Sequence, residues 1–245
     1  MLFLTAAGGH RFGLIETVPF FWLLGVTATF ALIGLALSAS GFSSLWKYGD
    51  RGGKDSVRGA IVALIVLCPF LVSGYRVVAY PRLNDISTDV VDPPRLAQAQ
   101  RLRSGAMNAI DAITAEEAEL QTMAYPAVTG RRYDVPFDRV LESVETVLAT
   151  RNWVRLGQSQ SGPPDERETS GLTLEVTAWS FWLGFPVDVA IRIVDEGETS
   201  FVDMRSSSRY MQHDMGDNAR RVMAFLDELG QDVAGKVAVA PAAGD

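Results

Sequence analysis

The sequence predicts an α+β protein, with an N-terminal two-helix transmembrane hairpin followed by an antiparallel sheet with helices packed on one face. Two long uncharged runs predict the hairpin, while a helical pattern after Pro136 and alternating patterns after Trp153 predict the helices and the sheet. These patterns divide the chain into four parts. They are a hairpin over residues 1–80, an extended segment and a helix over 81–124, an α+β domain over 125–233, and a disordered tail over 234–245.

The two uncharged runs are long enough to cross a bilayer. Residues 17–46 and residues 59–75 contain no Asp, Glu, Lys or Arg, and a transmembrane helix needs about 20 mostly apolar residues. We place the spans at about residues 18–39 and 59–80. The first run is too long and too poor in positive charge for a cleaved signal peptide, and its length also disfavours a buried helix pair of a soluble protein.

Positive charges next to the runs predict the orientation. Lys47, Arg51, Lys54 and Arg58 lie between the runs, whereas only Arg11 precedes the first run, and Arg76 and Arg82 follow the second. Because Lys and Arg are retained on the cytoplasmic side, we expect the loop to be cytoplasmic. The prediction is therefore a protein of the cytoplasmic (inner) membrane with two spans, whose C-terminal domain lies outside the membrane or in the periplasm. Small residues in both runs favour packing of the spans on one another or on a partner.

Composition excludes several classes of function. The 245 residues are 48% hydrophobic and 21% charged, with a net charge of −7. An acidic chain argues against nucleic acid as a partner, since nucleic-acid binding needs basic patches. The only cysteine, Cys68, rules out an internal disulfide, and the only histidines are His10 and His213. These residues predict no metal site, no cofactor and no catalytic residues.

The segment after the hairpin is expected to lie on the folded domain. Prolines and turn-forming residues in residues 80–94 favour an extended path, and scattered apolar residues supply contacts. Residues 95–120 then have a helical composition that is broken or weakened near Gly105.

The α+β domain begins near Tyr125. A helix opens at Pro136 and gives one apolar face, and residues 172–178 and 187–194 alternate as strands with one buried face. A final helix is expected from about Asp217 to Leu229, ending at Gly230.

The strand over residues 187–194 is predicted to form a hairpin with the chain from Phe201 to Arg205. If Glu196 and Gly197 make a two-residue loop, Val189 faces Met204, Ile191 faces Val202, and Asp188 faces Arg205.

Several separated motifs resemble one known family. They are the run from Tyr80 to Asp89 with Asp92-Pro93-Pro94, then Ala124-Tyr125-Pro126, then the run from Gly184 to Arg192, and last the run from Arg205 to Arg209 with Asp214, Gly216, Asn218, Ala219 and Arg220. Residues from Tyr80 to Leu229 are similar to the family named domain of unknown function 1499. The resemblance implies a membrane-associated or exported bacterial protein, and it carries no activity onto any residue.

A set of polar residues in these motifs is the candidate ligand site. Its members are Asn84, Asp85, Asp89, Arg205, Arg209, Asp214 and Asn218. They either converge into a pocket for a polar or anionic ligand or serve the fold. The sequence favours the second, structural role. In that structural interpretation a carboxylate of the extended segment pairs with Arg205 or Arg209, and Asp214 caps the last helix.

Aromatic residues pose a similar choice. Trp179, Phe181, Trp182 and Phe185 belong either to a core or to a membrane-facing loop, whereas an exposed aromatic patch would indicate a lipid or partner site.

We therefore expect a membrane-anchored extracytoplasmic binding or assembly module of the cell envelope, without catalysis. Its expected partners are membrane lipid and an envelope protein. The alternative is an envelope enzyme or a lipid-handling domain that uses a polar site around Asp85, Asp89, Arg205 and Arg209. The lipid-handling version needs an apolar cavity beneath the sheet or exposed aromatics near the spans.

Overall fold

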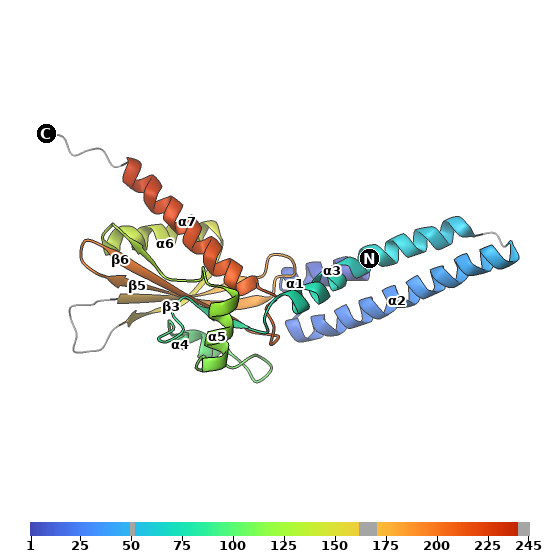
Figure 1. Cartoon of the computed structure of the whole chain (residues 1–245), viewed down its shortest axis with the longest axis horizontal. Coiled ribbons are helices and arrows are strands. Elements are labelled where there is room, and N and C mark those ends of the chain that lie inside the picture. Colours follow the sequence, from blue (N-terminus) through green and yellow to red (C-terminus); the bar gives the residue numbers. More distant parts are fainter. Residues whose placement is uncertain (50–51, 162–170, 240–245) are drawn as a thin grey trace. The chain divides into compact units, whose positions relative to one another are not determined.

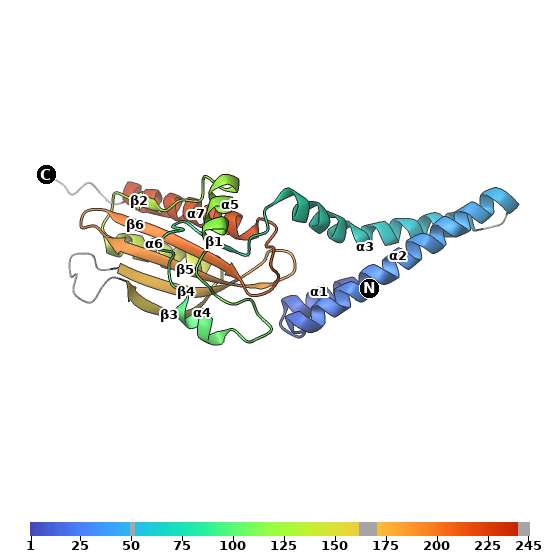
Figure 2. The same ribbon diagram turned by 60° about the horizontal axis from the view of Figure 1, so that its bottom comes forward.

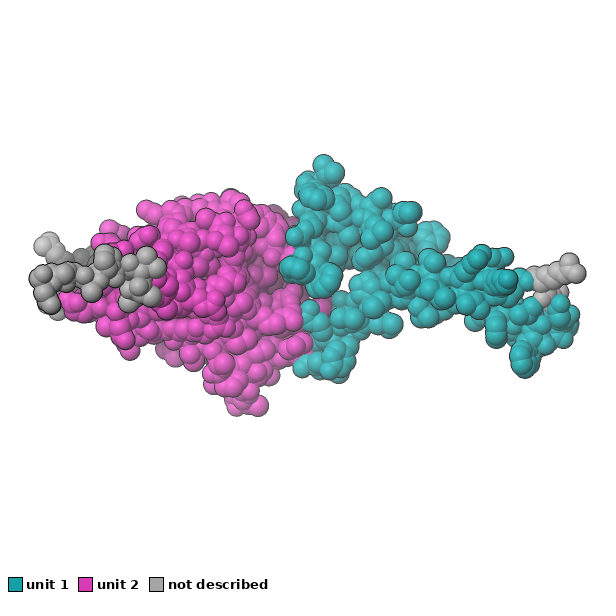
Figure 3. Space-filling model, turned by 90° about the horizontal axis from the view of Figure 1, so that it is seen from above, with its two compact units in different colours: residues 1–79, 181–184 teal, residues 80–180, 185–245 magenta. Residues whose placement is uncertain are grey.

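A computed structural model describes residues 1–49, 52–161 and 171–239 of the chain. It has two compact units (Figure 3). The first unit contains residues 1–79 with the short segment Phe181–Gly184, and the second contains Tyr80–Ser180 with the chain from Phe185 onward. The predicted α+β class, with two apolar N-terminal helices followed by an antiparallel sheet and helices, is confirmed.

Three helices make up most of the first unit: α1 (Leu2–Arg11), α2 (Thr17–Tyr48) and α3 (Gly53–Ala79). The sequence did not predict α1. Helices α2 and α3 are both long and apolar enough to cross a membrane, and few of their residues are buried within the protein. Helix α2 ends at Gly49, whose φ of 71° is the left-handed conformation that favours glycine at a helix C-terminus.

Small residues bring α2 and α3 together near the turn between them. A Cβ atom on Gly59 would lie 2.7 Å from Ser38 Oγ, and one on Gly41 would lie 2.8 Å from Ser56 Oγ. A side chain at either glycine would meet the facing serine hydroxyl, so these small residues favour the close approach of the two helices. The predicted packing of the two apolar runs on one another is therefore present. Ser38 and Gly59 are two of the small residues in these runs that make this contact.

The second unit is built on an antiparallel sheet. In the described part of the chain the sheet has six strands, with β1 (Asp85–Ser87), β6 (Ser200–Ser208), β5 (Pro186–Asp195), β4 (Gly171–Trp179) and β3 (Val154–Ser161) side by side in that order. Figure 2 shows the last four of these as neighbouring arrows. Strand β2 (Arg131–Tyr133) also pairs with β6.

Helices cover both faces of the sheet (Figure 1). On one face α6 (Phe137–Thr150) and α7 (Asp217–Val239) bury the main apolar core against the central strands. On the other, α4 (Ala97–Leu102) packs its Leu96 and Ala99 end against Ala190 of β5, and α5 (Ala115–Ala124) follows along the chain. The sequence predicted helices and a buried surface on one face of the sheet only. The chain between β1 and β2, which we call the covering segment, buries the second face as well.

One predicted detail of the sheet differs in the structure. The hairpin of β5 and β6 pairs Ile191 with Met204 and Asp188 with Ser207, two residues away from the predicted register, because four residues rather than two connect the strands. Residues 95–120 contain two helices, and the break expected near Gly105 is present as the non-helical residues 103–114.

Helix α7 does not end at Gly230. It continues to Val239, because Val233 still packs on the core and Lys236 pairs with Asp232 and Glu142. Of the predicted tail, residues 234–239 belong to this helix, and residues 240–245 lie outside the described residues.

Candidate binding site on the polar face of the sheet

Charged side chains gather on the face of the sheet that α6 and α7 do not cover. Side chains alternate along a strand, so every second residue of β4, β5 and β6 points to this side. We call it the polar face. Its members are Asp85 of β1, Glu175 and Thr177 of β4, Asp188 and Arg192 of β5, and Asp203, Arg205 and Ser207 of β6. Most of them are buried.

Glu175 is fully buried beneath α4. Its two carboxylate oxygens accept hydrogen bonds from the backbone N–H of Gln98, at 3.1 and 2.8 Å, and one also accepts from Ala99 at 3.0 Å. These N–H groups have no partner inside the helix, because they belong to its first turn. The carboxylate therefore attaches the start of α4 to the sheet.

Asp188 is held between two arginines. One oxygen accepts from Arg103 Nε at 2.9 Å, and the other accepts from Arg209 Nε at 2.9 Å and Nη2 at 2.7 Å. The side chains of Asp188 and Arg103 are 0% and 4% exposed. Arg103 also donates to Ser207 O at 3.0 Å, and Arg209 donates to Thr177 Oγ1 at 2.8 Å. The carboxylate is thus compensated by two cations and links β5 to the covering segment and to the chain after β6.

Asp85 and Arg205 form a neighbouring pair that joins β1 to β6. Arg205 donates from Nε and Nη2 to the two oxygens of Asp85, both at 3.0 Å, and also to Asp111 O at 2.9 Å. Gln121 of α5 completes the outer edge of β1, since its amide accepts from Ser87 N at 3.0 Å and donates to Ser87 O at 2.6 Å.

Asp89 lies at the rim of the polar face. Its Oδ1 accepts from the backbone N–H groups of Val91 and Asp92, both at 2.9 Å, and its other oxygen lies 3.7 Å from Arg192. Arg192 makes closer pairs with Asp92 at 2.7 Å and with Asp203 at 2.6 Å. Burial raises the pKa of Asp203 above its ordinary value, although Arg192 opposes that shift.

Asn84, Asp214 and Asn218 lie together where α7 begins. Asp214 accepts from the N–H groups of Gly216 at 2.9 Å and Asn218 at 2.7 Å. Asn218 then donates to Asn84 O at 2.9 Å and accepts from Ser206 Oγ at 2.9 Å. Burial raises the pKa of Asp214, while the two backbone hydrogen bonds oppose the rise.

Gly216 is required in this turn for two reasons. Its φ is 75°, and a Cβ atom there would lie 2.8 Å from the ring of Tyr80. Two neighbouring residues, Met211 and Met215, also have positive φ, at 66° and 57°. For residues other than glycine this conformation costs roughly 1–2 kcal/mol, so the surrounding contacts must hold the segment in place.

The seven candidate residues thus lie in two adjoining groups rather than around one pocket. Asp85 and Arg205 belong to the polar face, and Arg209 and Asp89 contact its members Asp188 and Arg192. The other three hold the start of α7. Each of the seven has hydrogen-bond partners inside the chain, which is what we expect of residues that serve the fold. The described residues contain no group of three or more His, Cys, Asp or Glu that could hold a metal.

Sequence reasoning missed several side chains that hold this region together. They are Arg103, Gln121, Glu175 and Arg192, and Asp188 was not recognised as the partner of Arg209. Glu175 and Asp188 had a signal, because each is a charged residue at an alternating position of a strand whose neighbours are apolar. Nothing local indicated Arg103 or Gln121.

A second candidate site is the loop Phe181–Gly184, which belongs to the same compact unit as the hairpin helices. Phe181 and Trp182 are 78% and 80% exposed. Their loop is held by α1, where His10 Nδ1 lies 2.7 Å from Leu183 O and Arg11 donates to Phe181 O at 2.6 Å. The His10 ring stacks on Phe20, with centroids 4.3 Å apart. Two aromatic side chains are thereby presented outward on a fixed backbone.

A comparison with protein-family models identifies the second unit. Residues 85–229 match the model described as "Protein of unknown function (DUF1499)". The chain belongs to this family. The match covers β1 to the middle of α7, so the DUF1499 domain includes the polar face and most of the candidate residues, while α1, α2 and α3 lie outside it.

Comparisons with other proteins add little to the DUF1499 assignment. No curated protein matches the chain. Among solved structures, CalU16 from Micromonospora echinospora is 17% identical, with a TM-score of 0.27 over 44% of this chain and 75% of that one. TTHA0849 from Thermus thermophilus is 13% identical, with a TM-score of 0.21 over 46% of this chain and 97% of that one. Similarities this distant carry no argument about the DUF1499 domain.

Proposed function

We propose that the chain is a membrane-anchored binding or assembly module of the bacterial cell envelope, with its DUF1499 domain on the periplasmic side. The apolar surface of α2 and α3 carries this proposal. Large apolar side chains stand exposed along both helices, among them Trp22 at 77%, Leu37 at 68% and Ile65 at 66%. Soluble proteins rarely expose an apolar surface of this extent, and a lipid bilayer would cover it.

The charge of the connecting turn supports the orientation. Lys47, Lys54 and Arg58 lie at or near this turn and are exposed, and positive loops are retained in the cytoplasm. With the turn in the cytoplasm, the chain after α3 emerges on the opposite side of the membrane.

The polar face favours a binding or assembly role over catalysis. Its buried carboxylates are paired with arginines or with backbone N–H groups, which fasten the covering segment to the sheet. A general base or nucleophile needs a neighbouring group that activates it for reaction with a substrate. Pairs that are committed to holding the fold do not provide that arrangement.

The exposed aromatic loop favours a lipid-contacting version of this function. Phe181 and Trp182 belong to the hairpin unit, and aromatic residues of this kind are enriched where proteins meet the membrane interface. We propose that this loop contacts lipid at the periplasmic surface.

Topology mapping by cysteine labelling tests the proposal. Cys68→Ser removes the only thiol, and single cysteines are then placed at Lys54 in the turn and at Glu119 on the exposed side of α5. In intact cells stripped of their outer membrane, a membrane-impermeant maleimide should label position 119 and not position 54. Labelling of position 54 alone would show that the orientation is the opposite of the proposed one. Release of the chain from membranes by alkaline extraction would show that the helices do not anchor it in the bilayer.

Native mass spectrometry of the full chain in lipid nanodiscs then tests the binding role. A stoichiometric second protein supports an assembly module, and a retained small molecule supports a ligand-binding domain. If the purified chain turns over a small molecule and this activity is lost in Asp89→Ala or Arg209→Ala, the chain is an enzyme and the proposed binding role is wrong.

A further inference from the structure

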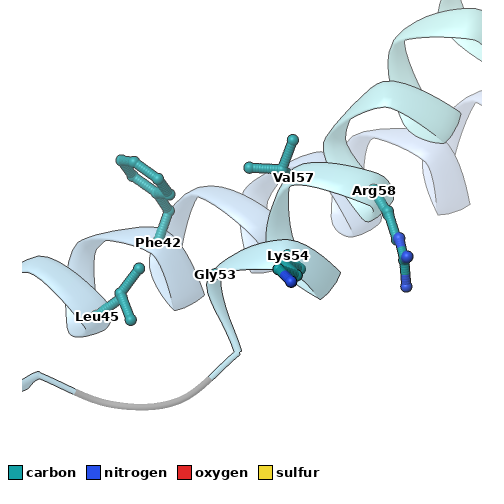
Figure 4. Close-up of a pocket in the computed structure, with 6 residues that line it drawn as sticks. All are labelled: Phe42, Leu45, Gly53, Lys54, Val57 and Arg58. Atoms are coloured by element: carbon teal, nitrogen blue, oxygen red, sulfur yellow. The ribbon is translucent and has the colours of Figure 1, made fainter.

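A groove lies at the end of the hairpin where α2 and α3 are joined (Figure 4). Its volume is about 540 Å³. The lining residues come from both helices: Phe42 and Leu45 from α2, and Gly53, Lys54, Val57 and Arg58 from α3. All of them belong to the described part of the chain, and none belongs to the DUF1499 domain.

The groove has an apolar part and a basic part. Phe42 and Val57 extend from the two helices on the same side of the pair, whereas Lys54 and Arg58 project from successive turns of α3. Residues four apart lie on one face of a helix, so the two cations belong to the same face of α3. An acyl chain against the apolar side chains and a phosphate against the cations would fill both parts.

The charges around the groove favour an anion. The described residues 47–49 and 52–58 contain the three cations Lys47, Lys54 and Arg58 and one carboxylate, Asp55. Asp55 pairs with Arg58 at 3.5 Å, but the two side chains are 84% and 78% exposed. An exposed pair of this length contributes little, so the guanidinium stays accessible to a stronger acceptor such as a phosphate oxygen.

Close packing of the helices holds the groove open on one side. A Cβ on Gly53 would lie 2.7 Å from Leu45 Cδ2, and the contacts of Gly41 and Gly59 described above keep the helix backbones close together. Because the helices approach here through small residues, Phe42 and Val57 border the groove rather than fill the space between helices.

We propose that this groove binds an anionic phospholipid, with its phosphate between Lys54 and Arg58. The part of an acyl chain next to the glycerol lies against Phe42 and Val57, just outside the predicted spans. The inference rests on the proposed membrane anchoring, and it adds a specific lipid contact on the side of the membrane opposite to the DUF1499 domain. A loop that only sets orientation would need the same charges but no apolar groove beside them.

The test measures which lipids stay bound to the full chain. The protein is reconstituted in nanodiscs with equal amounts of phosphatidylglycerol and phosphatidylcholine, and native mass spectrometry counts the lipids that each released molecule retains. The wild-type chain should retain phosphatidylglycerol in preference. Lys54→Gln and Arg58→Gln should each reduce that preference about 5-fold, the equivalent of about 1 kcal/mol for each cation near the lipid surface. Lys47→Gln, which removes a cation outside the groove, is the matched control.

The apolar part has its own variants. Phe42→Ala should lower the retention of phosphatidylglycerol, whereas Phe30→Ala, an exposed aromatic of the same helix outside the groove, should not. Added glycerol phosphate should fail to displace the lipid. If glycerol phosphate displaces it, the groove binds a free anion and the lipid assignment is wrong.

The remaining outcomes separate this inference from the membrane anchor. Equal retention of both lipids by the wild-type chain, or an equal effect of Lys47→Gln and Lys54→Gln, would contradict lipid binding in the groove and leave the proposed membrane anchoring unaffected. Failure of the chain to enter nanodiscs at all would contradict the membrane anchoring itself.

Discussion

Arg205 and Asp85 are joined by two parallel hydrogen bonds of 3.0 Å, and both side chains are largely buried. The pair connects the first strand after the hairpin to the central sheet, and the register places Asp85 opposite Ser207. Two parallel bonds from a guanidinium to a carboxylate fix orientation as well as distance. The fold of the DUF1499 domain therefore includes the chain that leaves the hairpin.

A double-mutant cycle measures this pair. Asp85→Ala, Arg205→Ala and the double variant should give a coupling free energy of about 1–3 kcal/mol, because a partly buried bidentate pair is lost in each. Unfolding in urea is followed by near-ultraviolet circular dichroism of the full chain in detergent. The same cycle on the exposed pair Arg131 and Asp227 should give less than about 1 kcal/mol. Equal couplings would show that burial adds nothing to the Asp85 pair.

Asp188 should be more sensitive than Asp85, because it compensates two arginines. Asp188→Ala leaves Arg103 and Arg209 close together without their carboxylate, and the loss of one partner from a buried pair costs about 3–5 kcal/mol. The unfolding midpoint in urea reports the loss. Asp227→Ala, which breaks an exposed pair, is the control. A small loss for Asp188→Ala would mean that water or a second carboxylate reaches the two arginines.

Gln121 should protect the edge of β1 from exchange. Gln121→Ala removes both hydrogen bonds to Ser87 and leaves backbone groups of a buried strand without partners, at a cost of about 1–3 kcal/mol. Hydrogen exchange at the Ser87 amide should accelerate, whereas Gln100→Ala on the exposed side of α4 should leave it unchanged. Unchanged exchange in both variants would show that the Ser87 amide is protected by other contacts.

Asp214 gives a pH dependence with a defined sign. Burial raises its pKa above the ordinary 3.8, so the folded protein binds this proton more tightly than the unfolded chain does. The resulting stabilisation is present below the unfolded pKa and is lost as the pH rises through the folded one. The stability of the wild type relative to Asp214→Asn should therefore fall as the pH rises above the ordinary pKa of 3.8. Urea midpoints of both proteins measure it, and a difference that grows with pH would contradict the raised pKa.

Local patterns were sufficient to predict β4, β5 and β6 and their apolar faces. The register of the hairpin of β5 and β6 was not predicted correctly, because its connecting loop has four residues instead of two. The loop is closed by a hydrogen bond from Glu196 N to Thr199 O at 3.0 Å. A shift of two residues keeps each side chain on the same face. The predicted apolar face was therefore correct although the partners of Ile191 and Asp188 were wrong.

The partners of these buried polar residues could not be predicted from any local pattern. Asp188 is separated by 85 residues from Arg103, and Gln121 by 34 from Ser87. The sequence around each residue is compatible with an exposed side chain, and only the path of the covering segment makes them buried partners. Gly230 is a similar case, since tertiary packing of Val233 continues α7 beyond a residue that often ends helices.

The loop Phe181–Gly184 gives the most direct test of membrane contact outside the hairpin. In a Cys68→Ser background, a spin label at Trp182→Cys should be more accessible to oxygen than to a water-soluble nickel chelate when the full chain is in liposomes. Oxygen concentrates in the bilayer and the chelate stays in water, and aromatic residues favour the interface between them. Because α1 holds this loop through Leu183 O and Phe181 O, the label should report one depth rather than an average over many positions.

A label at Glu119→Cys provides the matched control for this measurement. Glu119 is exposed on α5 in the DUF1499 domain, and the nickel chelate should reach it in liposomes and in detergent alike. The Trp182→Cys label should gain access to the chelate only when the protein is transferred to a detergent with a small micelle. If the chelate reaches position 182 in liposomes as readily as position 119, the aromatic loop faces water, and its exposed side chains are then available for a protein partner instead of lipid.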